Sequence, residues 1–324
     1  MRVKVIGVCL STIHEEDRLN FVKALNQYAV GENYRLMVFN SCTDLFVKDS
    51  INDMGEIPVF DLIPYHMLSA LIIFPYFLQD VFAMDTLIER AKKYAVPVIS
   101  IDKEKEGCYC FQFSYAGALE KLCRHVIKEH GARDIYMISG QKGNLFSEER
   151  VNAYRRALEK ENIPFSADKV AYGDFWEGPT QEAMKQWFTI EQRKIPDAIV
   201  CANDTMAIVA SSWLQRNGYK VPQDCIVTGF DGIMQASYHI PHLTTCHQDY
   251  DLMAEKLIQA INTLSNGGTW EKKTEIPFFV RISQSCGCEP TTSDGVNEAV
   301  QKLLDRLTNY KNRQNMLLNQ SLLL

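Results

Sequence analysis

One stretch, residues 196–248, constrains the fold of this chain more than any other. It reads PDAIVCANDTMAIVASSWLQRNGYKVPQDCIVTGFDGIMQASYHIPHLTTCHQ. Two short apolar runs, Ala198 to Cys201 and Cys225 to Gly229, are typical of buried parallel strands. The segment between them, Thr205 to Arg216, is predicted to be a helix that Gly218 ends. The stretch therefore predicts a βαβ unit, and with it an open parallel sheet of an α/β fold.

A polar turn follows each of these two strands. Asn203 and Asp204 follow the first strand, and Asp231 follows the second. Groups at the carboxyl ends of parallel strands face the ligand crevice of such a sheet, so the two turns are a candidate binding site. Alternatively, the side chains only cap the helices that follow them. The residues alone leave both interpretations open.

Four motifs in this stretch occur in a fixed order: AND-x-MA, G-x-x-VP-x-D, V-x-GFD and P-x-LTT-x-x-Q. This order resembles the lac/galactose repressor (LacI/GalR) family, and ordered motifs over about fifty residues are more specific than any one motif. The resemblance covers nearly the whole chain up to about Pro290. It implies a type 1 periplasmic-binding-protein-like fold: two doubly wound parallel-sheet lobes joined by a three-segment hinge, with a small ligand held between them.

The resemblance also implies the domain boundaries. An N-terminal lobe would comprise residues 1–112 and 249–279, and a C-terminal lobe residues 113–248 and 280–290. Residues 291–324 would form a linker and a C-terminal signalling helix. Apolar residues there recur in steps of four and three, which predicts a coiled coil and a homodimer, although one amphipathic helix docked on a lobe also fits.

Arg150 is the leading candidate for contact with an effector. It begins the pattern R-x-x-A-Y-x-x-A-L, which resembles the family's R-x-x-G-[FWY]-x-x-A-L with Ala153 in place of glycine. A cation in the first turn of a helix is disfavoured by the helix dipole, so its predicted place there favours a role in binding. In the family this arginine is the main hydrogen-bonding anchor. The resemblance thus implies that Arg150 and Asp231 hold the polar groups of the ligand.

Aromatic and polar residues complete the predicted ligand-binding set. The resemblance implies that Phe175 and Phe113 cover the faces of the ligand, with Trp176 as an alternative to Phe175. The further candidates lie at predicted strand ends or beside the last crossing: Ser11, Thr12, Asp102, Asn203, Gln248 and Tyr250. For Asp102, contact with ligand hydroxyls and a role in capping its turn are equally compatible with the sequence.

The sequence has no motif that points to an enzyme or a cofactor. No G-x-G-x-x-G follows a predicted strand, and neither a Walker loop nor a G-x-S-x-G elbow occurs. We therefore expect a protein that is not an enzyme and needs no cofactor.

We also expect no metal site. The pair Cys286 and Cys288 could be combined with three histidines, but the spacing matches no common zinc pattern. Those histidines are His239, His242 and His247. A second pair, His125 and His130, is five residues apart on a predicted helix, which is the wrong spacing for one face.

Charge and cysteine usage limit the partners and the compartment. The net charge is −6 and no basic block occurs, so this chain has no electrostatic footprint for contact with nucleic acid. The ten cysteines lie singly in predicted strands and helices, which fits reduced thiols. No signal peptide or membrane-length apolar run is evident, so we expect a cytoplasmic protein without membrane contact.

The expected function is a cytoplasmic sensor for a small, sugar-like or nucleoside-like effector. The motif Ser285-Cys286-Gly287-Cys288 resembles a subgroup whose sensor relays its signal through a C-terminal helix to an output domain such as a GGDEF-type diguanylate cyclase. A family repressor would begin with a helix-turn-helix head, whereas this chain starts at the first sensor strand. The competing expectation is therefore the sensor part of a DNA-binding repressor. A third hypothesis, a periplasmic-type sugar-binding transport receptor, fits less well because no signal peptide is evident.

Overall fold

The structure, a computed structural model, describes residues 4–42, 57–76, 78 and 81–289 of the 324-residue chain. The chain divides into two compact units: unit 1 holds Met1–Glu120 and His247–Phe279, and unit 2 holds Lys121–Cys246 and the chain from Val280 onward. The chain passes between the units three times, as a three-segment hinge requires. The boundary at the first crossing was predicted between residues 112 and 113, and in the structure it lies between residues 120 and 121. The second boundary was predicted between residues 248 and 249, and it lies between residues 246 and 247. The predicted C-terminal coiled coil lies outside the described residues.

Unit 1 is built on a six-stranded sheet in the order β11-β5-β4-β3-β1-β2. All five pairings between neighbouring strands are parallel. The strands are β1 (Lys4–Ser11), β2 (Tyr34–Ser41), β3 (Leu68–Ile73), β4 (Val98–Ile101), β5 (Tyr109–Phe113) and β11 (Lys273–Ile276). Strand β4 is buried along its whole length, as expected where helices cover both faces of a parallel sheet.

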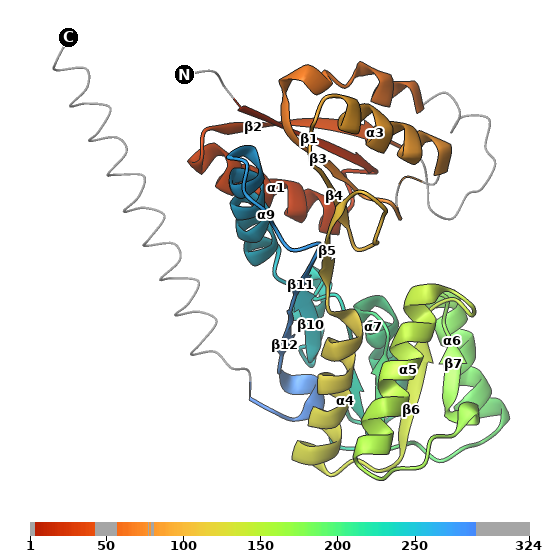
Figure 1. The fold of residues 1–324 in the computed structure, drawn as a ribbon. Coiled ribbons are helices and arrows are strands. Elements are labelled where there is room, and N and C mark those ends of the chain that lie inside the picture. The colour runs from red at the N-terminus through yellow and green to blue at the C-terminus, as the bar shows by residue number, and fades with distance from the viewer. Residues whose placement is uncertain (1–3, 43–56, 77, 79–80, 290–324) are drawn as a thin grey trace. The chain divides into compact units, whose positions relative to one another are not determined.

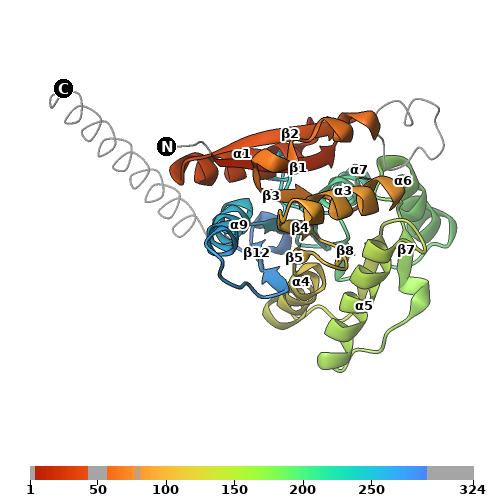
Figure 2. The same ribbon diagram turned by 45° about the horizontal axis from the view of Figure 1, so that its top comes forward.

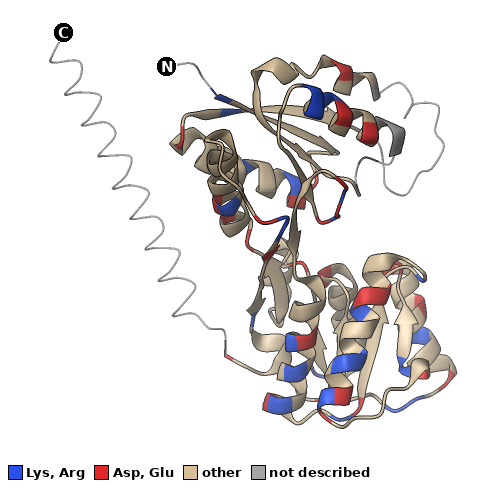
Figure 3. Ribbon diagram, in the orientation of Figure 1, with Lys and Arg blue, Asp and Glu red and all other residues tan. Residues whose placement is uncertain are grey.

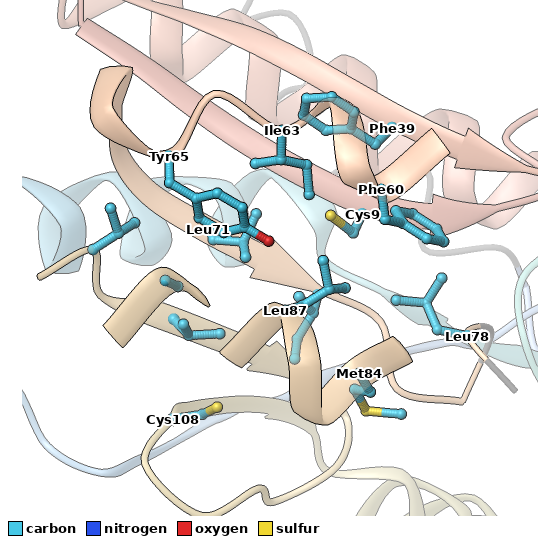
Figure 4. Close-up of a cluster of buried hydrophobic side chains, with 14 residues drawn as sticks. Cys9, Phe39, Phe60, Ile63, Tyr65, Leu71, Leu78, Met84, Leu87 and Cys108 are labelled. Atoms are coloured by element: carbon cyan, nitrogen blue, oxygen red, sulfur yellow. The ribbon is translucent and has the colours of Figure 1, made fainter. Parts of the chain in front are cut away.

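Helices flank this sheet on both faces (Figures 1 and 2). Helices α1 (Glu16–Gly31) and α9 (Tyr250–Ser265) lie side by side on one face. On the other face, α3 (Val81–Lys93) packs with the 3₁₀ turn η1 (Ile57–Leu62), and η2 (Tyr65–Met67) follows. Figure 4 shows the apolar core there, where Cys9 and Leu71 of the sheet meet Phe60 and Leu87. This packing leaves the carboxyl ends of the strands as the edge from which turns emerge.

Unit 2 contains a four-stranded parallel sheet in the order β7-β6-β8-β9. Its strands are β6 (Ile135–Ser139), β7 (Val170–Tyr172), β8 (Ala198–Cys201) and β9 (Ile226–Thr228). The associated helices and turns are α4 (Tyr115–His130), α5 (Leu145–Lys160), η3 (Ala167–Lys169), α6 (Glu177–Lys185), the π-helical turn η4 (Gln186–Ile190), α7 (Asp204–Arg216), α8 (Met234–Tyr238) and η5 (Gln284–Cys286). Two parallel sheets with flanking helices confirm the predicted α/β class.

The sequence predicts a helix start at Ile57 to Tyr65, a crossing between the lobes at Tyr109 to Ser114 and a single last strand at Glu275 to Arg281. The structure differs in all three, and proline explains two of the differences. A single last strand was predicted over Glu275 to Arg281, but Pro277, which has no N–H to donate, separates β11 from β12 (Phe278–Arg281). Strand β12 pairs instead with β10 (Thr245–Gln248). Pro58 and Pro64 likewise limit residues 57–67 to two 3₁₀ turns where a helix start was predicted. The segment after Tyr109, predicted as a crossing, is strand β5 of the unit 1 sheet.

Charges of both signs are interspersed along α4 and α5 (Figure 3). Arg124 Nε on α4, for example, donates to Glu161 Oε1 at 2.8 Å. These helices therefore present no surface of a single sign. Within the described ranges, none of the helices has the length and apolar character needed to cross a membrane.

Candidate functional site

Four turns emerge at the carboxyl edge of the unit 2 sheet. They begin at Gly140 after β6, Gly173 after β7, Ala202 after β8 and Gly229 after β9. Because the four strands are parallel, these turns share one edge, where α/β folds place ligands. Residues from the last three turns meet the side chain of Arg150, which comes from α5.

The guanidinium of Arg150 is almost fully buried, and the residue is 6% exposed. Its Nη1 donates to the carbonyl of Ala202 at 2.6 Å, and its Nη2 lies 3.4 Å from Asp231 Oδ1. Its Cζ lies 4.5 Å from the ring centroid of Phe230 and 5.5 Å from that of Phe175, within the range of cation–π attraction. A carbonyl, a carboxylate and two ring faces thus compensate for the burial of this cation.

Arg150 does not lie in the first helical turn, so that part of the prediction is wrong. Helix α5 begins at Leu145, because Asn144 caps it by accepting hydrogen bonds from the N–H groups of Phe146 and Ser147. This cap places Arg150 in the second turn, where the field of the helix dipole is smaller. The dipole argument for a binding role therefore does not apply.

Asp231, the partner of Arg150, is the more accessible of the two, with 35% of its side chain exposed against 7% for Arg150. Its backbone φ is +98°, a conformation that L-residues rarely adopt. Strained backbone of this kind concentrates at functional sites. The structure thus brings the two leading candidates together, with the carboxylate on the solvent side.

Phe175 lies beside Arg150, whereas Trp176 is 70% exposed at the start of α6. The ring of Phe175 packs on Gly140, where an added Cβ would lie only 2.0 Å from a ring carbon. Asn203 holds the same turn: its Nδ2 donates to the Phe175 carbonyl at 3.2 Å, while its Oδ1 caps α7 by accepting from the Met206 N–H at 2.8 Å. Asn203 therefore joins two of the turns.

Asp204 is a component of this edge that the sequence indicated either as part of a binding turn or as a helix cap. Its side chain is fully buried, and its Oδ2 accepts a hydrogen bond from the Ile233 N–H at 2.9 Å. Burial raises the pKa of this carboxyl to about 7. Asp204 thus links the turn after β8 to the turn after β9. The sequence signal was the Asn-Asp pair at a strand end, which does not reveal burial.

The candidates in unit 1 lie at the ends of β1, β4 and β5. Asp102 accepts hydrogen bonds from the Phe113 N–H at 3.0 Å and the Tyr115 hydroxyl at 2.8 Å. Burial raises its pKa to about 6. Both carboxylate oxygens of Asp102 thus hold the connection from β5 to α4, and its contact with a ligand stays a prediction. Ser11 is fully buried, and the backbone N–H of Thr12 donates to Ser41 O at 2.7 Å.

Phe113 belongs to an aromatic cluster of unit 1. Its ring contacts Tyr250 edge-on, with centroids 5.7 Å apart, and the Tyr250 hydroxyl donates to Gln248 Oε1 at 2.7 Å. Phe113, Tyr250 and Gln248 thus form one contiguous group. Phe113 itself is 4% exposed, so it is a core residue as well as a candidate contact.

The prediction that His125 and His130 have the wrong spacing to meet is contradicted. Their Nε2 atoms lie 3.2 Å apart, next to the sulfurs of Cys286 and Cys288. The three histidines that the sequence analysis considered with these cysteines are His239, His242 and His247. Among the residues that the structure describes, the one cluster of possible metal ligands consists of His125, His130, Cys286 and Cys288, and it contains none of the three. His239 Nε2, for example, lies 2.8 Å from Ser211 Oγ.

Comparison with known proteins relates the chain to bacterial regulators. The HTH-type transcriptional repressor PurR of Aliivibrio fischeri is 35% identical over 148 residues, which is 46% of this chain and 40% of that protein. PurR of Yersinia pestis is 37% identical over 134 residues, or 41% and 39% of the two chains. The chain thus matches well under half the length of these repressors.

Solved structures extend the likeness to most of the described chain. The lac repressor dimer bound to operator and the anti-inducer ONPF matches with a TM-score of 0.68 at 20% identity, covering 87% of this chain and 93% of that chain. The complex of the transcriptional regulator CelR with cellobiose matches with a TM-score of 0.68 at 18% identity, covering 88% and 86%. At such identities the likeness concerns the fold alone.

A family model described as "Periplasmic binding protein-like domain" matches residues 125–286, which are 162 of the 324 residues and thus half of the chain. The ordered motifs, the two parallel-sheet units and the PurR relatives agree with that match. The chain therefore belongs to the family of periplasmic binding protein-like domains.

Proposed function

We propose that the chain senses a small polar effector, sugar-like or nucleoside-like, that is anchored by Arg150 and Asp231. The observation that carries this proposal is the buried guanidinium held between the Ala202 carbonyl, the Asp231 carboxylate and the rings of Phe175 and Phe230. A guanidinium donates only and a carboxylate accepts only, so together they select the donor and acceptor pattern of ligand hydroxyls. The flat ring of Phe175 offers a face for an apolar surface of the ligand.

The geometry of the pair supports access by a ligand. The 3.4 Å separation of Arg150 Nη2 and Asp231 Oδ1 is longer than the roughly 2.7–2.9 Å of a tight charge-assisted bond. The partly exposed Asp231 carboxylate can therefore accept a hydroxyl without breaking a short ion pair. The cellobiose complex of CelR, which shares the fold, supports a sugar among the candidates.

The proposed context is a cytoplasmic, homodimeric regulator that is not itself an enzyme. Its C-terminal segment would relay effector binding to an output domain such as a diguanylate cyclase, as the SCGC motif indicates. Effector binding would shift the population of two conformations, and the output would follow that shift.

A second candidate is the sensor part of a DNA-binding repressor. The PurR relatives, named as HTH-type transcriptional repressors, and the operator-bound lac repressor of the same fold favour it. The gene sequence flanking residues 1–324 discriminates between the two, because a helix-turn-helix head and a cyclase domain have unlike sequences.

A thermal-shift screen tests the sensor proposal. Pentoses, hexoses, disaccharides including cellobiose, and nucleosides are added singly to the full chain. A ligand at about 100 times its Kd stabilises the folded state by about 2.7 kcal/mol, which raises the Tm by several degrees. We expect at least one compound to do so, and Arg150→Ala to abolish the shift.

Arg156→Ala is the matched control, because Arg156 is exposed on the same helix. It should retain the shift seen with the unaltered chain. If Arg150→Ala also retains it while circular dichroism shows an intact fold, Arg150 is not the anchor. If none of the compounds shifts the Tm, the proposed ligand class is wrong.

A further inference from the structure

A second cluster of ligating side chains lies where α4 ends. His125 and His130 come from α4, and Cys286 and Cys288 come from η5 and the residues after it. Their Nε2 and Sγ atoms all lie within 4.8 Å of one another. None of the four belongs to the effector site proposed above, so an inference from them is independent of effector binding.

The separations in this cluster match the edges of a coordination tetrahedron. The two Nε2 atoms are 3.2 Å apart, and the nitrogen–sulfur separations are 3.4 Å (His130–Cys288), 3.6 Å (His125–Cys286) and 3.7 Å (His125–Cys288). Zn²⁺ bound at about 2.0–2.1 Å to nitrogen and 2.3 Å to sulfur in a tetrahedron separates its ligands by roughly 3.3–3.7 Å. A single hydrogen bond would account for one such pair, but not for four ligand atoms that all lie within 4.8 Å of one another.

Local backbone geometry explains why these residues converge. His125 and His130 differ by roughly 140° around a regular helix, but His130 is the last residue of α4, and Gly131 ends the helix with φ +70°. The His130 side chain is therefore not confined by a following helical turn. Between the two cysteines, Gly287 has φ +94°, which turns the chain so that both sulfurs face the histidines.

The segment that carries the cysteines is held in place by its own buried hydrogen bonds. Ser283 N–H donates to Thr244 Oγ1 at 2.8 Å, and Thr244 N–H donates to Ser285 Oγ at 2.8 Å. Ser285 Oγ in turn donates to the Val227 carbonyl at 2.5 Å. Thr244 Oγ1 also lies 3.0 Å from the sulfur of Cys286, where it can donate to a thiolate. Such surrounding bonds orient metal ligands before the ion arrives.

We propose that His125, His130, Cys286 and Cys288 bind Zn²⁺ in tetrahedral coordination and thereby fasten residues 283–288 to the end of α4. Two thiolates and two imidazoles make a closed, structural type of zinc site. The absence of oxygen ligands from this set disfavours Mg²⁺ and Ca²⁺. Because Cys288 lies directly before residues 289–324 in the sequence, the ion fixes the last part of the described chain that precedes that segment.

Cobalt substitution in the full chain tests the proposal. The protein is made metal-free with a chelator under reducing conditions and titrated with Co²⁺. Tetrahedral Co²⁺ with thiolate ligands gives visible d–d bands and a near-ultraviolet charge-transfer band. We expect both bands to saturate at equimolar Co²⁺, and equimolar Zn²⁺ to remove them.

A matched pair of double variants assigns the ligands. His130→Gln with Cys288→Ser removes one ligand of each type, whereas His14→Gln with Cys42→Ser removes the same residue types from exposed positions. We expect the first variant to lose the charge-transfer band and the copurified zinc, and the second to keep both. Chelation should lower the Tm of the unaltered chain and of the control, but not that of the ligand variant.

Three results would overturn the proposal. One is the lack of a thiolate–cobalt band in the unaltered, reduced chain, a measurement that does not depend on how any variant folds. Another is equal cobalt spectra for the two double variants. The third is a Cys286–Cys288 disulfide in protein purified without added oxidant, because that bond removes both thiolate ligands.

Discussion

At the scale of single residues, the ordered motifs and the helix pattern were sufficient to select Arg150 and Asp231, which the structure places 3.4 Å apart. Their contact with a ligand stays a prediction. The burial of Asp204 was not predictable, because Asn-Asp at a helix start has the same sequence signature whether the cap is exposed or buried. Only the packing of the turn after β9 onto Asp204 distinguishes the two cases.

Asp204 predicts a pH dependence of stability. Its pKa is about 7 in the folded chain and about 4 in an unfolded one, so the unfolded chain releases this proton first. The contribution of Asp204 therefore lowers the free energy of unfolding as pH rises from about 4 to about 7, by on the order of a few kcal/mol. Asp204→Asn keeps an acceptor for the Ile233 N–H and removes the ionisation.

Urea unfolding of the unaltered chain and of Asp204→Asn, each at about pH 5 and about pH 8, measures this effect. The variant should lose less stability than the unaltered chain between the two conditions, and it should be the more stable protein at the higher pH. Parallel losses in the two proteins would show that Asp204 is already ionised in the folded state well below pH 7.

At the scale of elements, short buried strands were the most predictable part of the chain. Residues 198–201, for example, form a strand with the predicted bounds. The predictions were wrong where a helix began or ended at a residue that the sequence pattern had not indicated. Asn144 starts α5 early and moves Arg150 out of the first turn, and the end of α4 frees His130 from helical spacing. The convergence of His125 and His130 with Cys286 and Cys288 depends on contacts between distant segments, which spacing within one helix does not reveal.

The turn after β7 and the start of α7 depend on one side chain, Asn203. Asn203→Ala removes the cap of α7 and the bond to the Phe175 carbonyl, so we expect it to lower the free energy of unfolding by about 1–2 kcal/mol. Asn203→Ser retains a capping oxygen but is too short to reach Phe175. It should recover most of that loss in urea titrations. If Ser is as destabilising as Ala, the bond to the Phe175 turn outweighs the cap.

At the scale of the whole molecule, the ten cysteines report on the integrity of both units. All ten are thiols rather than disulfides, eight of them are buried, Cys42 is exposed and Cys288 is intermediate. Burial raises the pKa of Cys108 and of Cys110 to about 11, and the pKa of Cys201 and of Cys246 also lies well above its ordinary value. Because the thiolate is the reactive form, these four buried thiols combine low access with low reactivity.

Alkylation with iodoacetamide, followed by peptide mass spectrometry, turns this distribution into a test of the whole fold. In the native, zinc-loaded chain Cys42 should react quickly, and Cys288 should react only after a chelator has removed the metal. The seven buried cysteines other than the proposed zinc ligand Cys286 belong to both units and should react no faster than the chain unfolds. Urea should therefore expose them in step with the loss of the helical circular dichroism signal. Rapid labelling of Cys9, Cys201 or Cys246 in the absence of urea would contradict the packing described for the unit that holds that cysteine.

The same experiment shows whether the two units unfold together. If the thiols of one unit are labelled at a lower urea concentration than those of the other, the two units unfold separately, as their division into two compact bodies allows.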